Sequence, residues 1–120
     1  MVAYEVRYNM EESEYHNGVA LLDGSGPFKN AQGTAFYEAR GTKEVRFKVQ
    51  LSGVPELANT TIDVIVGDTK VGQMKIDAGG KGKLSVKAKP GDFPAVTDLT
   101  EVTIKTITPK QTVAEGVFGA

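Results

Sequence analysis

The sequence predicts an all-β fold, namely a single antiparallel β-sandwich with about nine short strands. The first observation is the strict alternation of apolar and polar residues over 44–51, which gives a strand one buried and one solvated face. The second is that similar segments recur along the chain, separated by Gly, Pro, Asn and Asp. The third is weak helical spacing, which leaves only single helical turns, expected at 56–59 and 94–99. Uneven strand lengths favour two packed sheets over a barrel.

The N-terminal segment predicts a strand at residues 2–8 followed by a polar arm. The residues on the apolar face of this strand are Val2, Tyr4, Val6 and Tyr8. Residues 9–18 are polar and too numerous for a hairpin turn, so they are expected to join this strand to the rest of the chain. We therefore divide the chain into an N-terminal strand and polar arm, residues 1–18, and a β-sandwich body, residues 19–120.

Three strands are expected in the first part of the body, at 19–22, 33–40 and 43–51. A stretch that contains Gly and Pro ends the first of them, because Gly permits a sharp turn and Pro blocks strand extension. Gly41 and Thr42 match a tight two-residue turn, so the two strands beside them should pair.

The middle of the chain predicts strands at 61–66, 70–76 and 83–88. Gly67 and Asp68 turn the first of these strands into the second, and the Gly-rich segment 77–82 turns the second into the third. We expect the three strands to lie side by side in meander order.

Two strands close the chain, at 102–106 and 111–118. Glu115 and Gly116 interrupt the apolar face of the last strand, which indicates a bulge or a sheet edge. The aromatic residues expected in the core are Phe36, Phe47 and Phe118.

Composition indicates one soluble globular domain. The 120 residues are 40% hydrophobic and 24% charged, and the net charge is −1. This composition supports a core and provides no global field for nucleic acid or an anionic membrane. No stretch approaches the roughly 18 apolar residues of a membrane span, and no signal peptide is visible. We therefore expect no nucleic-acid partner and no membrane insertion.

Residues that support catalysis or cofactor binding are sparse. The chain contains no Cys, which excludes disulfides and thiol chemistry, and its only His, His16, lies in polar surroundings typical of a solvated loop. One His cannot supply the imidazole ligands of a zinc, copper or iron site. The Gly-rich segment 77–82 precedes a strand, whereas a phosphate-binding loop precedes a helix, so a hairpin is expected there. We expect no cofactor, no catalytic residue and no enzymatic activity.

A row of Lys residues shares one face of the strand predicted at 83–88. Its members are Lys81, Lys83, Lys87 and Lys89. Such a row is typical of a solvated face that discourages edge-to-edge pairing, and it also suits contact with an acidic partner. The candidates for that partner are Glu11, Glu12 and Glu14 of another copy of the chain.

Tyr and Asp residues in predicted loops offer a second class of function, a ligand-binding module for a carbohydrate or a calcium-bridged target. The aromatic residues considered for a stacking platform are Tyr4, Tyr8, Tyr15, Phe28 and Tyr37. The acidic residues are Asp63, Asp68, Asp77, Asp92 and Asp98, which are spread over separate turns and strands. Asn59 begins an N-x-[ST] sequon, and the sequence does not decide whether it is glycosylated.

Several short stretches give the body a resemblance to a known family. These stretches are Gly33–Tyr37, Val45–Val49, Leu51–Pro55, Val71–Gly72 and Gly116–Phe118. Their succession, over roughly residues 19–118, resembles the CHRD-type β-sandwich domains of bacterial exported proteins. The His-containing segment that follows the Leu-Ser-Gly-Val stretch in that family is absent from this chain. The resemblance implies an immunoglobulin-like sandwich that serves as an extracellular or cell-surface module, and it carries over no site residue.

These observations predict a non-enzymatic structural or adhesion module, extracellular or at the cell surface, that self-associates by β-strand addition into oligomers or filaments. The strand at 2–8 would complete the sheet of a neighbouring copy, and the alternative is that it folds back onto its own sheet. The expected partner is therefore the chain itself, with another surface protein or a glycan as the alternative.

Overall fold

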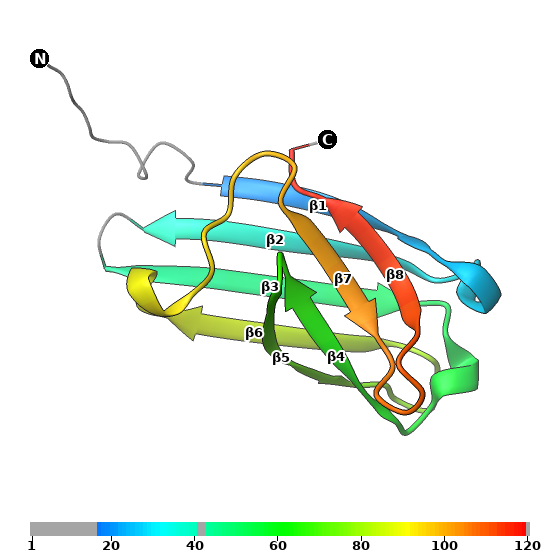
Figure 1. Ribbon diagram of the computed structural model, residues 1–120. Coiled ribbons are helices and arrows are strands. Elements are labelled where there is room, and N and C mark those ends of the chain that lie inside the picture. Colours follow the sequence, from blue (N-terminus) through cyan, green and yellow to red (C-terminus); the bar gives the residue numbers. More distant parts are fainter. Residues whose placement is uncertain (1–16, 41–42, 120) are drawn as a thin grey trace, which may run out of the picture.

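The structure is a computed structural model that describes residues 17–40 and 43–119. Its strands are β1 (Asn17–Gly24), β2 (Gln32–Arg40), β3 (Glu44–Ser52), β4 (Thr61–Val66), β5 (Thr69–Lys75), β6 (Gly82–Ala88), β7 (Glu101–Lys105) and β8 (Thr112–Val117). They form one eight-stranded antiparallel sheet in the order β5-β4-β7-β8-β1-β2-β3-β6, which curls until it is nearly closed like a barrel (Figure 1). The prediction of an all-β antiparallel fold is confirmed. The strand predicted at 2–8 lies outside the described residues.

The strands predicted in the body correspond to β1–β8, and each predicted end lies within two residues of the observed one. Two predicted hairpins are also confirmed. Arg40 at the end of β2 pairs with Glu44 at the start of β3, and Val66 at the end of β4 pairs with Thr69 at the start of β5. Local alternation and turn residues therefore determine these strands and their nearest pairings.

The predicted meander of the strands that correspond to β4, β5 and β6 is wrong, because β6 pairs with β3. The Asp77 carboxylate accepts hydrogen bonds from the backbone N–H groups of Gly79, at 2.9 Å, and Lys81, at 3.0 Å, which gives the tight turn that the sequence indicates. The connection between β3 and β4 also holds this turn, because the Val54 N–H donates to the Gly80 carbonyl at 3.2 Å. The Gly-rich segment consequently carries the chain from β5 across to β6, which pairs with β3. The predicted hairpin between β5 and β6 is absent.

β5 and β6 are the two edges of the sheet, and they meet at a seam. Gly72 of β5 packs so closely on Leu84 of β6 that a Cβ atom added to Gly72 would lie 2.8 Å from Leu84 Cδ2. The missing side chain of Gly72 therefore permits the approach of the two strands. No β-ladder between β5 and β6 joins the described residues, so side-chain packing closes the sheet at this seam.

Apolar side chains fill the interior of the curled sheet. The Phe47 and Phe93 ring centroids lie 5.4 Å apart, and the Tyr37 ring lies 6.1 Å from Phe93 and 6.2 Å from Phe118. Phe47 and Phe118 are fully buried, as predicted. No polar or charged residue is buried in the part of the chain that the structure describes. The core is thus an apolar, aromatic-centred one, and the polar chemistry of the described residues lies on the surface.

The prediction that Phe36 belongs to the core is wrong, because its side chain is 42% exposed. Its neighbours Ala35 and Tyr37 both face the interior. Successive side chains of a strand point to opposite faces. Phe36 stands between Ala35 and Tyr37 in the sequence, so its side chain points to the outer surface.

The interruption predicted in the last strand is a bulge at an interior position. β8 pairs with β7 on one side and, through Ala114 and Glu115 in its middle, with β1 on the other, so it is not a sheet edge. Ile104 lies opposite Ala114, whereas Lys105 lies opposite Thr112, so Val113 is the extra residue. The bulge therefore precedes the Glu115–Gly116 position at which it was expected.

The helical turns are the 3-10 turns η3 (Gly26–Phe28), η4 (Pro55–Leu57) and η5 (Pro90–Asp92). Each has one Pro, at its first or second position, where the fixed φ of Pro suits the first turn. η4 overlaps the turn predicted at 56–59, whereas the turn predicted at 94–99 is wrong. Phe93 is extended, with φ −117° and ψ 144°, as expected for a residue that precedes Pro.

Candidate functional site

The Lys row predicted from the sequence lies along β6, one of the two edge strands of the sheet. Lys83 and Lys87 belong to β6, Lys81 and Lys89 flank it, and all four are exposed. The apolar residues that alternate with them face the core. The remaining residues of the predicted association site lie outside the described part of the chain, and these are Val2, Tyr4, Val6, Tyr8, Glu11, Glu12 and Glu14.

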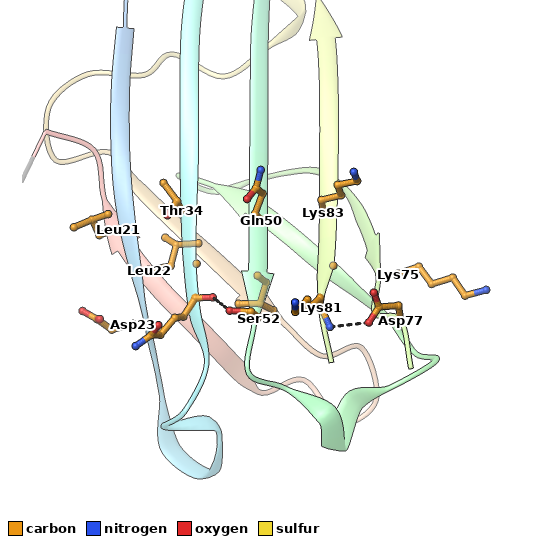
Figure 2. Close-up of a pocket in the computed structure, with 14 residues that line it drawn as sticks. Leu21, Leu22, Asp23, Thr34, Gln50, Ser52, Lys75, Asp77, Lys81 and Lys83 are labelled. Carbon is orange, nitrogen blue, oxygen red and sulfur yellow. Dashed lines mark hydrogen bonds between the residues drawn. The ribbon is translucent and has the colours of Figure 1, made fainter. Parts of the chain in front are cut away.

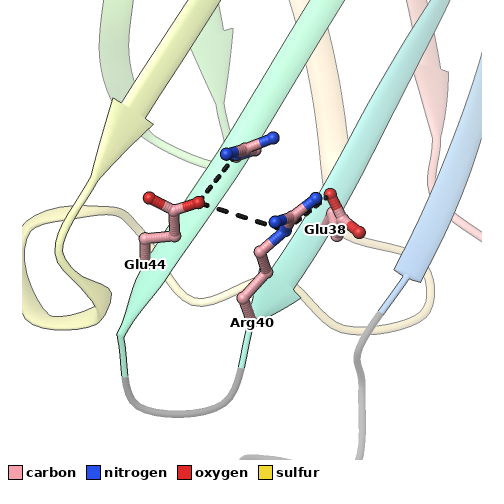
Figure 3. A network of polar contacts seen from close by, with 4 residues as sticks. Glu38, Arg40 and Glu44 are labelled. Carbon is pink, nitrogen blue, oxygen red and sulfur yellow. Dashed lines mark hydrogen bonds and ion pairs between the residues drawn. The ribbon is translucent and has the colours of Figure 1, made fainter.

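Glu residues neutralise the Arg residues near the hairpin between β2 and β3 (Figure 3). Arg46 Nε lies 2.7 Å from Glu44 Oε2. Arg40 Nε lies 3.4 Å from Glu38 Oε1 and 4.0 Å from Glu44 Oε2. Each exposed pair contributes at most about 1 kcal/mol to stability. Their larger consequence is that these two Arg residues offer little uncompensated charge to a partner.

Three Lys residues on the same outer face have no comparable acidic neighbour. Within residues 17–40 and 43–119, no ion pair involves Lys48, Lys83 or Lys87. Lys48 of β3 lies opposite Ser85, the residue midway along the Lys row. We call Lys48, Lys83 and Lys87 the basic patch. Its positive charge is available to an anionic partner that approaches β6.

A shallow open depression crosses the outer face of β1, β2, β3 and β6 (Figure 2). A row of opposed residues lines one side of it, and these are Leu21, Thr34, Gln50 and Lys83. Its lining contains no His and no Cys. Asp77 also lines it, but the backbone of the Gly-rich turn already uses its carboxylate. The depression therefore offers a mixed polar surface without a nucleophile and base placed together.

Three large apolar side chains are exposed beside this depression, on β1 and β2. Val19 is 46% exposed, Leu21 is 68% exposed, and Phe36 lies opposite Val19 in the β1–β2 pairing. The predicted apolar strand at 19–22 did not separate the exposed Val19 and Leu21 from their buried neighbours Ala20 and Leu22. The period of two along β1 was the available signal, because it assigns alternate members of an apolar run to opposite faces.

Partly covered apolar side chains lie at the seam. Leu84, Val86 and Ala88 of β6 face the core but remain half-buried, as does Val71 of β5. The core-facing residues of the neighbouring β3 are all buried. The difference arises because β6 has a neighbouring strand on only one side. No sequence pattern indicates this feature, since it depends on which strands form the edges.

The alternative ligand-binding residues do not converge in the described structure. Phe28 and Tyr37 are buried in the core and present no ring face to solvent, which corrects their place in an exposed platform. The platform's other aromatic residues and His16 lie outside the described residues. In the described ranges, no group of three or more His, Cys, Asp or Glu residues is arranged to hold a metal ion. Asn59 is exposed, and its glycosylation stays a prediction.

Comparison with known proteins does not assign this chain. No protein-family model matches it, and no curated protein matches it. The described residues also contain no helix of the length and apolarity needed to cross a membrane.

Proposed function

We propose that this chain is a non-enzymatic structural or adhesion module that self-associates by β-strand addition into oligomers or filaments. The observation that supports the proposal is that β5 and β6, the two edges of an otherwise continuous sheet, form no backbone ladder with each other in the described residues. An edge strand presents unpaired backbone N–H and C=O groups, which an added strand can pair while its alternate side chains fill apolar sites. Val2, Tyr4, Val6 and Tyr8 supply such a strand.

We also propose that the sheet works as an immunoglobulin-like sandwich of two four-stranded halves. β1, β2, β3 and β6 form one half, and β5, β4, β7 and β8 form the other. Support comes from the short junction between β1 and β8, where Asp23 lies opposite Glu115 and Gly24 lies opposite Ala114. The resemblance to CHRD-type exported domains belongs to the same proposal, and it favours an extracellular or cell-surface location.

Deletion of residues 1–8 tests the self-association. We expect the full-length chain to form oligomers and the truncated chain to remain folded as a monomer, because the deletion removes the inserting strand and leaves the described core intact. Size-exclusion chromatography with light scattering measures both masses, and circular dichroism checks that the truncated chain is folded. A monomeric full-length chain contradicts the proposal, as does an oligomer that survives the deletion.

Charge reversal at Lys83 and Lys87 tests the contribution of the basic patch. We expect Lys83→Glu with Lys87→Glu to weaken association severalfold at low salt, because Glu11, Glu12 and Glu14 then meet like charge. The matched control is Lys29→Glu with Lys110→Glu, which makes the same charge change at two exposed residues outside β6. Equal dissociation constants for the two double variants would show that net charge alone governs association.

The alternative function, a ligand-binding module for a glycan or a calcium-bridged target, has less support because Phe28 and Tyr37 are buried. Glycan binding that survives removal of residues 1–10 would favour it over self-association.

A further inference from the structure

We infer that β6, and not β5, is the edge that receives the N-terminal strand, and that the strand comes from a second copy of the chain. This assignment rests on the proposed self-association and specifies where it occurs. β5 and β6 both lack a ladder partner on one side in the described structure, so the choice between them depends on their shape, their apolar cover and their charge.

β6 is the more regular of the two edge strands. β6 follows β3 in one uninterrupted register from Leu51 opposite Gly82 to Val45 opposite Ala88. β5 follows β4 with a register shift between Val64 and Ile65. A bulge bends and twists an edge and thereby hinders the addition of a further strand. β6 is therefore the better template.

The apolar cover of β6 is less complete than that of β5. Three successive core-facing residues of β6 are half-buried, and these are Leu84, Val86 and Ala88. On β5, Val71 is half-buried, Met74 is fully buried, and Gly72 has no side chain to cover. A strand beside β6 would place alternate apolar residues against Leu84 and Val86. The apolar face of residues 2–8 has the same period of two.

Charge complementarity also favours β6. Lys83 and Lys87 line the outer face of this edge and have no ion-pair partner in residues 17–40 and 43–119. The polar face of the incoming strand contains Glu5, and the acidic residues Glu11, Glu12 and Glu14 follow it. On β5, Lys70 already pairs with Asp63 at 3.3 Å, and Gln73 donates to the same carboxylate. Among the described residues, β6 therefore carries two Lys residues without an ion pair, Lys83 and Lys87, whereas β5 carries one, Lys75.

Strand direction favours a second copy over the chain's own N-terminus. β1 begins at the end of the sheet at which β6 finishes, because each of the three pairings between them is antiparallel. If the polar arm continues the direction of the strand at 2–8 into Asn17, that strand runs toward the same end, and beside its own β6 it would be parallel. All pairs in this sheet are antiparallel, and a second copy can approach β6 in that orientation.

Disulfide trapping tests the edge assignment. The chain has no native Cys, so every disulfide that forms joins the two introduced residues or two copies of one of them. Full-length Glu5→Cys is mixed under mild oxidation with a second full-length variant that carries one Cys on β6, at Lys83, Ser85 or Lys87. The matched controls carry Cys at Thr69, Gln73 or Lys75 on β5, which are likewise exposed. Paired strands place facing residues within the distance range of a disulfide. We expect heterodimers, measured by mass spectrometry, with at least one β6 variant and a clear deficit with all β5 variants.

Light scattering on the unmodified chain separates the two ways in which this result can fail. Oligomers with no β6 heterodimer, or with heterodimers at β5, overturn the edge assignment and leave self-association standing. A chain that is monomeric at every concentration overturns both proposals. Heterodimers at β6 that disappear when residues 1–4 are deleted from the Glu5→Cys chain support the assignment, because formation then depends on the apolar strand and not on chance collision.

Discussion

Replacing Phe47 with alanine is expected to lower the free energy of unfolding by about 3–5 kcal/mol, the range for a buried aromatic side chain. Phe47 is 1% exposed, and its ring packs 5.4 Å from that of Phe93 in the centre of the core. Truncation removes this contact and leaves a cavity that surrounding strands cannot fill, because backbone pairing holds β3 on both sides. Urea denaturation followed by far-ultraviolet circular dichroism measures the change.

Phe36→Ala is the matched control for Phe47→Ala. The two residues belong to paired strands and have the same size, but Phe36 lies on the outer face. We expect its truncation to cost less than about 1 kcal/mol. A similar loss for both variants would contradict the assignment of inner and outer faces to β2 and β3.

Gly80→Ala is expected to destabilise the protein by about 2–4 kcal/mol, through a strained backbone and a steric clash together. Gly80 has φ +80°, a conformation that L residues rarely adopt, and an added Cβ atom would lie 2.5 Å from Pro55 N and 2.7 Å from Pro55 Cα. Both neighbours are backbone atoms, so the clash can be relieved only by displacing the connection between β3 and β4. The same urea experiment measures the loss.

Gly91→Ala is the control for Gly80→Ala. Nothing lies within 4 Å of a Cβ atom added to Gly91, and its φ is not in the left-handed region. We expect a change within about 0.5 kcal/mol of zero. If the two Gly variants proved equally stable, the turn that contains Gly80 would not be anchored on Pro55 as described.

The positions of the strands could be predicted because they follow from local patterns. The alternation over 44–51 determines which residues of β3 are buried, and it holds without knowledge of the neighbouring strands. Phe36 was expected in the core as an aromatic residue, but its parity along β2 places it on the outer face. Ala35 and Tyr37 face the core, and the small Ala side chain hid the alternation of β2.

The pairing of β6 could not be predicted, because a tight Gly-rich turn has the same residues in a hairpin and in a crossover. Asp77 and Gly80 satisfy the turn locally in either case. The distinction depends on the contact between Gly80 and the segment at Val54 and Pro55, which are far away in sequence. Strand order is set by such long-range contacts, and they leave no periodic signal.

The candidate site shows the same division between local and long-range information. The exposure of Lys83 and Lys87 follows from parity along one strand, and it was predicted. Their place at a sheet edge, beside half-buried Leu84 and Val86, follows from the fact that β6 pairs with only one strand, β3. Sequence patterns therefore gave the charge of this surface and not its position in the fold.

The packing of Gly72 against Leu84 has a consequence for the circumference of the molecule. In a fully bonded cylinder, strand number fixes the diameter, and an insertion must break existing backbone bonds. Here the last join is made by side chains, so the sheet can open at the seam and grow by one strand on β6 without the loss of any β-pairing between the described strands.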